Sequence, residues 1–271
     1  MSRPPRLAAR AALAALAAAL GLMSGPVAAR QELRILAEVD PPFVTVRDGV
    51  PGGPYIESLR ALLAREGLSL QVSLMPRRRI SVTLPVSPGS CGLALNFSPG
   101  EAETFSYVGR VAPVKLAVYA LRQAPRVGNI EELRPYRIGA VDMAELRDFL
   151  TAADIAFEPI SPAAQRLGML QRKRFDYLVS DDRPEMFEVE GADQVRRVFV
   201  LAQVDRWLAC HPGLPPRLLA TLRQALQEGL FAESLRPIWD RAGLGRYFDR
   251  VRLEWELIPK AAGAAASRRS P

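Results

Sequence analysis

The chain has 271 residues, which is long enough for one large domain or two small ones. Its formal net charge of +7 falls to +1 when the three arginines of residues 1–29 and the three basic residues of 259–271 are left out. A nearly balanced charge without a clustered basic face excludes the electrostatic footprint of a nucleic-acid-binding protein.

The first 29 residues are typical of a secretory signal peptide. Arg3, Arg6 and Arg10 form a positive start, an apolar run from Ala11 to Met23 follows, and small residues precede a cleavage site near Ala29. The 13 residues of that run are too few to span a bilayer core of about 30 Å, and no later segment is long and apolar enough to do so. We therefore expect export, cleavage near Ala29 and no membrane insertion of the mature chain.

The next segment alternates between strands and a helix. Residues 33–39 form an apolar run that ends at Pro41 and Pro42, because proline cannot continue a strand ladder. Residues 55–67 have apolar residues at helical spacing and end at Gly67. Strands are expected at 68–76 and 91–97, and the prolines of 77–90 favour an irregular segment there. This order favours a parallel sheet covered by helices.

A second α/β run follows a long strand at 113–122. Strands are expected at 136–141, 155–160 and 176–182, and the helices between them at 143–153 and 161–174. Strands at 195–202 and 206–211 follow, and the chain then has two closing helices at 215–230 and 231–243. We expect residues 30–113 and 204–258 to form one lobe and residues 114–203 a second lobe, with two hinge strands and a cleft between them. The Ala/Ser/Arg tail at 259–271 is expected to be disordered.

Cys91 and Cys210 lie 119 positions apart in an exported chain. An oxidising compartment permits a disulfide between them. Two separate buried thiols are equally compatible with the sequence, so both interpretations remain open.

The sequence offers no catalytic set. His211 is the only histidine, and its neighbour Cys210 does not make a dyad with it, because adjacent side chains need not face each other. One His and two Cys give no metal-ligand spacing, and the Gly52-Gly53 pair indicates only a turn. We therefore predict a protein that is not an enzyme and has no cofactor, and an enzyme on this fold is the least favoured reading.

An ordered set of segments resembles the type II periplasmic solute-binding proteins. These segments are the "PPF" turn, the glycine turn into a helix that ends in "REGL", the block "QRKRFDYLVSD" and the two closing helices, within residues 33–257. The nearest branch is the polar amino-acid-binding family 3, which delivers solutes to ABC importers. The resemblance implies an α/β fold of two lobes, each a mixed sheet flanked by helices, joined by a two-strand hinge. It also implies a periplasmic monomer that closes around its solute.

The resemblance marks candidate ligand-binding residues at strand ends. Glu38 and Asp40 follow the first strand, where the family often has a polar ligand contact. Phe43 fits an aromatic wall after the proline pair, although ordinary core packing explains it as well. Asn96 and Ser98 end the third predicted strand, where backbone and hydroxyl groups meet a ligand.

Three further candidates carry charge. Arg79 matches a basic position of the family and could bind a carboxylate, or it could belong to a solvated basic cluster. Asp142 replaces an anion-holding turn, and a helix N-cap is the alternative there. Asp181 matches the acid that pairs with a ligand's ammonium group, and a loop acid or N-cap is again the alternative.

The turn at residues 95–106 lacks a basic residue. In amino-acid-binding relatives this segment carries an Arg that clamps the ligand's α-carboxylate, whereas here it contains Glu101 and Glu103. A carboxylate ligand would lose a pair worth ~1.5–3 kcal/mol unless Arg79 replaces it. The turn therefore favours a cationic or neutral solute, or no solute.

Two hypotheses follow. The leading one is a periplasmic protein that binds a small polar solute and presents it to an ABC importer permease. The alternative is a degenerate member of this fold that acts as a partner of a periplasmic enzyme such as a quinoprotein dehydrogenase.

Overall fold

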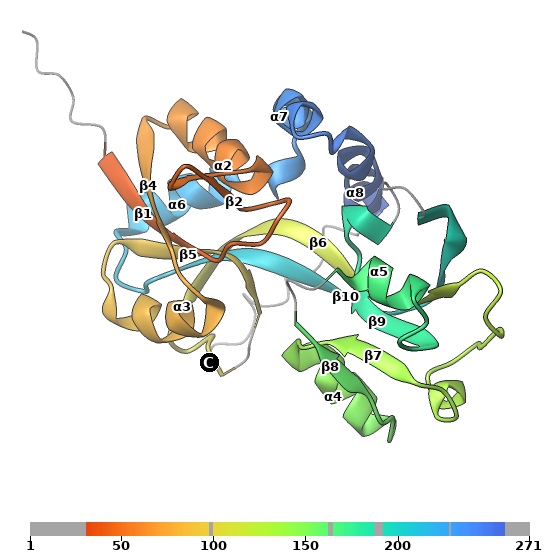
Figure 1. The fold of residues 1–271 in the computed structure, drawn as a ribbon. Helices are drawn as coiled ribbons and strands as arrows, with labels where there is room; N and C mark the ends of the chain where they lie inside the picture. Colours follow the sequence, from red (N-terminus) through yellow and green to blue (C-terminus); the bar gives the residue numbers. More distant parts are fainter. Residues whose placement is uncertain (1–30, 98–99, 162–164, 187–191, 228, 258–271) are drawn as a thin grey trace, which may run out of the picture. The chain divides into compact units, whose positions relative to one another are not determined.

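The computed structural model describes residues 31–97, 100–161, 165–186, 192–227 and 229–257 (Figure 1). The predicted signal peptide, Ser98 and the predicted tail lie outside these residues. Within the described part of the chain, no helix is both long enough and apolar enough to cross a membrane.

One mixed sheet organises the described residues (Figure 1). Its eight strands lie in the order β4-β1-β5-β10-β6-β9-β7-β8, and β2 and β3 form a separate hairpin. Parallel pairs include β1 with β5, β7 with β8 and β7 with β9, as expected for strands joined by helical crossovers. The bounds are β1 Gln31–Ala37, β2 Thr45–Arg47, β3 Val50–Gly52, β4 Leu68–Leu74, β5 Ser90–Asn96, β6 Ser106–Leu121, β7 Ile138–Val141, β8 Glu158–Ile160, β9 Tyr177–Asp181 and β10 Val195–Cys210.

The long strands β6 and β10 connect the two halves of this sheet. They pair antiparallel along their length, from Val195 opposite Leu121 to Cys210 opposite Ser106. The end of β10 also pairs with β5, and β6 also pairs with β9, so each long strand belongs to both halves. The predicted two-strand connection is confirmed. The prediction of two short strands at 195–202 and 206–211 is wrong, because pairing with β6 carries a single strand through the polar residues between them.

The helices agree with the sequence pattern only in part. Their bounds are α2 Pro54–Arg65, α3 Arg77–Thr83, α4 Ala144–Ala152, α5 Arg166–Gln171, α6 Pro216–Ala225, α7 Arg236–Arg241 and α8 Gly245–Leu257. The expectation of an irregular segment at 77–90 is wrong for its first half, because the prolines of this segment, Pro85 and Pro88, come after α3 has ended at Thr83. The predicted helix at 231–243 is broken into short 3-10 turns and α7, and α8 was not predicted.

Buried apolar side chains form separate clusters on the two halves of the sheet. The largest is built from β1, α2, β5, the ends of β6 and β10, and the closing helices α6, α7 and α8. Two others lie around β7 and β9, one with α4 and one with α5, and both include residues of β6 from 114 onward. These clusters fit the two lobes that we expected from the sequence, and the lobe boundaries remain a proposal.

Cys91 and Cys210 form a disulfide, which decides between the two interpretations left open by the sequence. The two residues are directly opposite each other on β5 and β10, and both are fully buried. Because they are 119 positions apart, the bond joins the beginning of the chain to the strand that returns from the second half of the sheet.

Candidate functional site

Polar residues follow three strands of the sheet. Asp40 lies three residues after β1 ends, Asn96 is the last residue of β5, and Asp181 is the last residue of β9. β1 and β5 are parallel, whereas β9 runs opposite to them, because β5, β10, β6 and β9 pair antiparallel in turn. The last residues of β5 and β9 both lie near the middle of the long strands, where Asn96 pairs with Arg206 and Asp181 with Leu116. Ligands of α/β folds bind outside the carboxyl ends of strands. The candidate site is therefore built from the segments that follow β1, β5 and β9.

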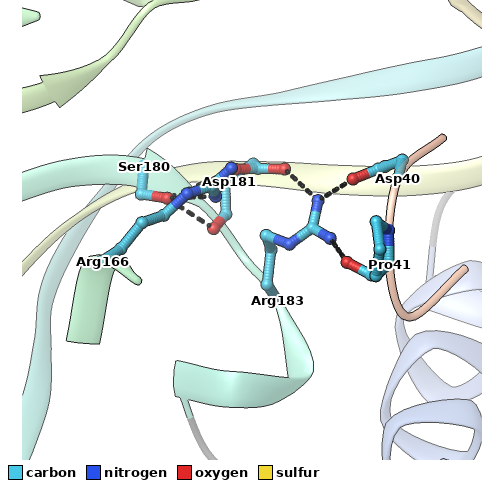
Figure 2. A network of polar contacts seen from close by, with 6 residues as sticks. All are labelled: Asp40, Pro41, Arg166, Ser180, Asp181 and Arg183. Carbon is cyan, nitrogen blue, oxygen red and sulfur yellow. Dashed lines mark hydrogen bonds and ion pairs between the residues drawn. The ribbon is translucent and has the colours of Figure 1, made fainter. Parts of the chain in front are cut away.

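Arg183 joins two of these segments (Figure 2). Its Nη1 lies 2.7 Å from Oδ1 of Asp40 and 3.7 Å from Oδ2 of Asp181, and its Nη2 donates a hydrogen bond to the carbonyl oxygen of Pro41. Asp40 and Arg183 are 143 positions apart in sequence. The segments after β1 and β9 are thus held together by one guanidinium group.

Asp181 has a second arginine partner inside the fold. Nη1 of Arg166, at the start of α5, pairs with Oδ1 of Asp181 and also lies 2.9 Å from the hydroxyl oxygen of Ser180, to which it donates (Figure 2). The Arg166 side chain is only 2% exposed, so it is a buried cation with a buried counter-ion.

The charges around Asp181 keep its carboxylate ionised. Burial alone would raise the pKa of Asp181, but Arg166, Arg183 and Arg206 together hold this pKa below its ordinary value. The resemblance implies that the carboxylate of Asp181 pairs with a ligand's ammonium group. In the structure, arginines of the chain itself compensate this negative charge.

Phe43 lies beneath the guanidinium of Arg183. The Arg183 Cζ atom is 5.1 Å from the centroid of the Phe43 ring, within the range of a cation–π contact. The other neighbours of Phe43 are aromatic: Tyr55 stacks on it at 4.8 Å and Tyr247 lies 5.2 Å away. Phe43 is 4% exposed, so it packs in the core and faces the polar site only through Arg183.

A second polar group surrounds Arg77, the first residue of α3. Its backbone N–H donates to Oε1 of Glu38 at 3.0 Å, its Nη1 to the carbonyl oxygen of Ala94 at 3.0 Å, and its Nη2 to Oδ1 of Asn96 at 3.4 Å. Burial and the charge of Arg206 lower the pKa of Arg77 to about 10. Arg77, rather than the predicted Arg79, points toward Glu38 and Asn96, and Arg79 is exposed.

Asn96 also reaches the second half of the sheet, because its Nδ2 donates to Oε1 of Glu145 on α4. Asp142 lies apart from this group and pairs with Arg147 at an exposed position. The N-cap alternative for Asp142 is wrong: the cap position of α4 is Met143, and no side chain caps the helix.

The structure thus brings together most of the candidates. Asp40, Phe43 and Asp181 meet around Arg183, and Glu38 and Asn96 meet around Arg77. Arg79 and Asp142 do not join either group, and Ser98 lies outside the described residues.

Sequence reasoning missed four partners: Arg77, Glu145, Arg166 and Arg183. A signal existed for Arg77, because Arg77 and the fully buried Ile80 are three residues apart on one face of a helix. No comparable signal identified Arg166 or Arg183.

The described residues contain no group of three or more His, Cys, Asp or Glu side chains that could hold a metal ion. The sulfur of Cys210 is in the disulfide and is not available as a nucleophile. Nδ1 of His211 accepts a hydrogen bond from the backbone N–H of Gly213 at 2.9 Å, which gives this histidine a role in a turn.

No protein-family model matches the sequence, and a search of curated proteins found no match. Solved structures do match. The unliganded, open L-cystine solute receptor of Neisseria gonorrhoeae has a TM-score of 0.62 and 17% identity, over 80% of this chain and 94% of that one. An ancestral arginine-binding protein bound to arginine has a TM-score of 0.60 and 16% identity, over 83% and 98%.

A histidine kinase sensor domain with similarity to periplasmic binding proteins also matches, with a TM-score of 0.60 and 19% identity over 83% of this chain and 96% of that one. At these identities the likeness establishes the fold alone. The chain therefore has the mixed α/β, two-lobed fold that these periplasmic-binding-protein-like structures share.

Proposed function

We propose that the protein binds a small polar solute at the carboxyl ends of β1, β5 and β9. The observation that carries this proposal is the convergence of charged and polar groups there: Asp40 and Asp181 around Arg183, and Glu38 and Asn96 around Arg77. Buried or half-buried charges are costly unless they are paired or meet a ligand. We further propose that residues 30–113 with 204–258 and residues 114–203 are the two lobes that close over the solute.

The role that we assign to the solute-binding protein is delivery to an ABC importer in the periplasm. Support comes from similar structures whose descriptions name an L-cystine solute receptor and the substrate-binding protein of an amino-acid ABC transporter. The polar amino-acid-binding branch suggested by the sequence is consistent with similar structures that are described as an arginine-binding protein and a cationic amino acid solute binding protein. The proposal does not include catalysis.

Isothermal titration of the mature chain against amino acids, amines and small carboxylates tests solute binding. We expect heat with at least one class, and a loss of affinity of about tenfold or more in Arg77→Met, because a charge-assisted contact is removed. Arg79→Met is the matched control: it removes the same charge from an exposed position two residues away. If the folded chain binds no solute of the panel, the proposal is contradicted.

The second candidate is a partner protein that has lost solute transport. It is favoured by direct contacts between the two proposed lobes, from Arg183 to Asp40 and from Asn96 to Glu145, in which side chains of the chain itself pair with the candidate residues. In this case we expect a defined complex with a periplasmic enzyme, for example a quinoprotein dehydrogenase, and no heat with any solute. Affinity isolation from periplasm followed by titration of the purified partner separates the two candidates.

A further inference from the structure

We propose that Arg183 acts as a tethered ligand, whose guanidinium group fills a cation site formed by Asp40, Pro41, Phe43 and Asp181. The inference rests on the proposed function in one respect, namely that the ends of β1 and β9 line the solute site. It goes beyond that function because it says what fills part of the site before any solute arrives.

The surroundings of Arg183 are those that a free guanidinium would need. Two carboxylates approach it, that of Asp40 at 2.7 Å and that of Asp181 at 3.7 Å, and the carbonyl oxygen of Pro41 accepts a hydrogen bond (Figure 2). The ring of Phe43 covers one side at 5.1 Å. Acids, a carbonyl oxygen and an aromatic face are together the chemistry that recognises guanidinium compounds.

The low exposure of its side chain distinguishes Arg183 from the arginine of an ordinary surface ion pair. The Arg183 side chain is 5% exposed and that of Asp181 is 10% exposed, whereas that of Asp40 is 44% exposed. The guanidinium is therefore buried, and of the two carboxylates that approach it only that of Asp40 is exposed to solvent.

The two carboxylates do not depend equally on Arg183. Asp181 retains Arg166 as a partner when Arg183 is removed, so the buried end of the network remains compensated. Asp40 has Arg183 as its ion-pair partner, on a segment 143 positions away. The same arginine thus fills the cation site and connects the segment after β1 to the segment after β9.

This arrangement places Arg183 in competition with any cationic solute. An intramolecular group has an effective concentration that a dilute solute must exceed before it binds. The wild-type chain is therefore expected to bind guanidinium compounds weakly, and removal of Arg183 is expected to uncover the site.

The test is a chemical rescue with Arg183→Ala. Methylguanidinium is titrated at millimolar concentrations into the wild type and the variant, and N-methylurea, a neutral compound of similar shape, serves as the control ligand. We expect Arg183→Ala to bind methylguanidinium at least about tenfold more tightly than the wild type and to ignore N-methylurea. Adding Asp40→Asn to Arg183→Ala is expected to remove this gain.

Equal methylguanidinium affinity in folded wild type and Arg183→Ala would overturn the proposal, and so would a gain that survives Asp40→Asn. If Arg183→Ala does not fold, refolding is measured with each compound present. Recovery with methylguanidinium alone supports the proposal, and recovery with neither compound overturns it. This test is separate from the test of the proposed function. A wild type that binds no natural solute would contradict the proposed function, but the affinity of Arg183→Ala for methylguanidinium would still support or overturn the tethered ligand.

Discussion

Asp181→Asn tests whether the carboxylate of Asp181 is an internal counter-ion. The substitution preserves the shape of the side chain but removes the carboxylate that pairs with the cation of Arg166, which is 2% exposed. Removal of one member of a buried ion pair costs about 3–5 kcal/mol. Ser180 keeps one contact to Arg166 at 2.9 Å, so we expect a loss near 3 kcal/mol, at the lower end of that range.

Urea denaturation at pH 7 gives the free energy of unfolding for this comparison. Asp176→Asn is the control, because Asp176 pairs with Arg137 at 2.9 Å at an exposed site and its loss should cost less than ~1 kcal/mol. Asp181→Asn combined with Arg166→Met should recover most of the loss, since no charge is then left unpaired.

The pH dependence of this effect has a definite sign. The pKa of Asp181 is lowered in the folded protein, so its stabilising contribution is complete above the unfolded pKa of about 3.9 and is lost as the pH falls through the folded pKa. The difference between wild type and Asp181→Asn should therefore shrink below pH ~4. An unchanged urea midpoint at pH 7, together with abolished binding of an amine solute, would refute the reasoning and make Asp181 a ligand residue.

Three other changes have expected outcomes. Burial raises the pKa of Asp182 to about 6, so its ionisation opposes folding from about pH 4 upward. The wild type should therefore lose up to ~3 kcal/mol of unfolding free energy between pH 4 and 7, and Asp182→Asn should remove this loss, as measured by denaturation at both pH values. Cys91→Ala with Cys210→Ala opens a 119-residue loop and should cost ~4–5 kcal/mol by the same assay, with no further loss on adding reductant. Gly53→Ala should cost ~1–3 kcal/mol in urea, because φ is +95° and the new Cβ would lie 2.6 Å from the carbonyl oxygen of Phe43.

The sequence predicted those elements whose residues are apolar enough to form a pattern by themselves. β1, β5 and β9 each contain a short apolar run, at 35–37, 91–95 and 177–179, and α2 has its buried residues at helical spacing. α8 escaped prediction because six of its thirteen residues are charged and interrupt the apolar pattern, although Tyr247, Phe248 and Val251 are buried. β10 was divided because its length depends on pairing with β6, which a single-strand pattern does not contain.

The candidate site was predictable at the ends of strands but not in its pairings. Asp40, Asn96 and Asp181 were found because each follows an apolar run. Arg166 and Arg183 lie close to Asp181 in sequence, yet nothing in the sequence distinguishes an arginine that turns inward from one that faces solvent. That choice depends on the direction in which the folded backbone points each side chain.

The fold changes what the acidic turn at residues 95–106 implies about the charge of the solute. Its lack of a basic residue argued against a carboxylate ligand, but Arg77 of α3 and Arg206 of β10 supply cations from elsewhere. Burial and, after it, the charge of Arg206 lower the pKa of Arg77, so the two like charges oppose each other. Glu101 of the turn acts on Arg77 in the opposite direction, together with Glu38. Among the described residues, Nη1 of Arg206 is buried without a hydrogen-bond partner. A carboxylate placed beside Arg77 and Arg206 would relieve both costs, so the missing arginine of the turn no longer argues against an anionic group on the solute.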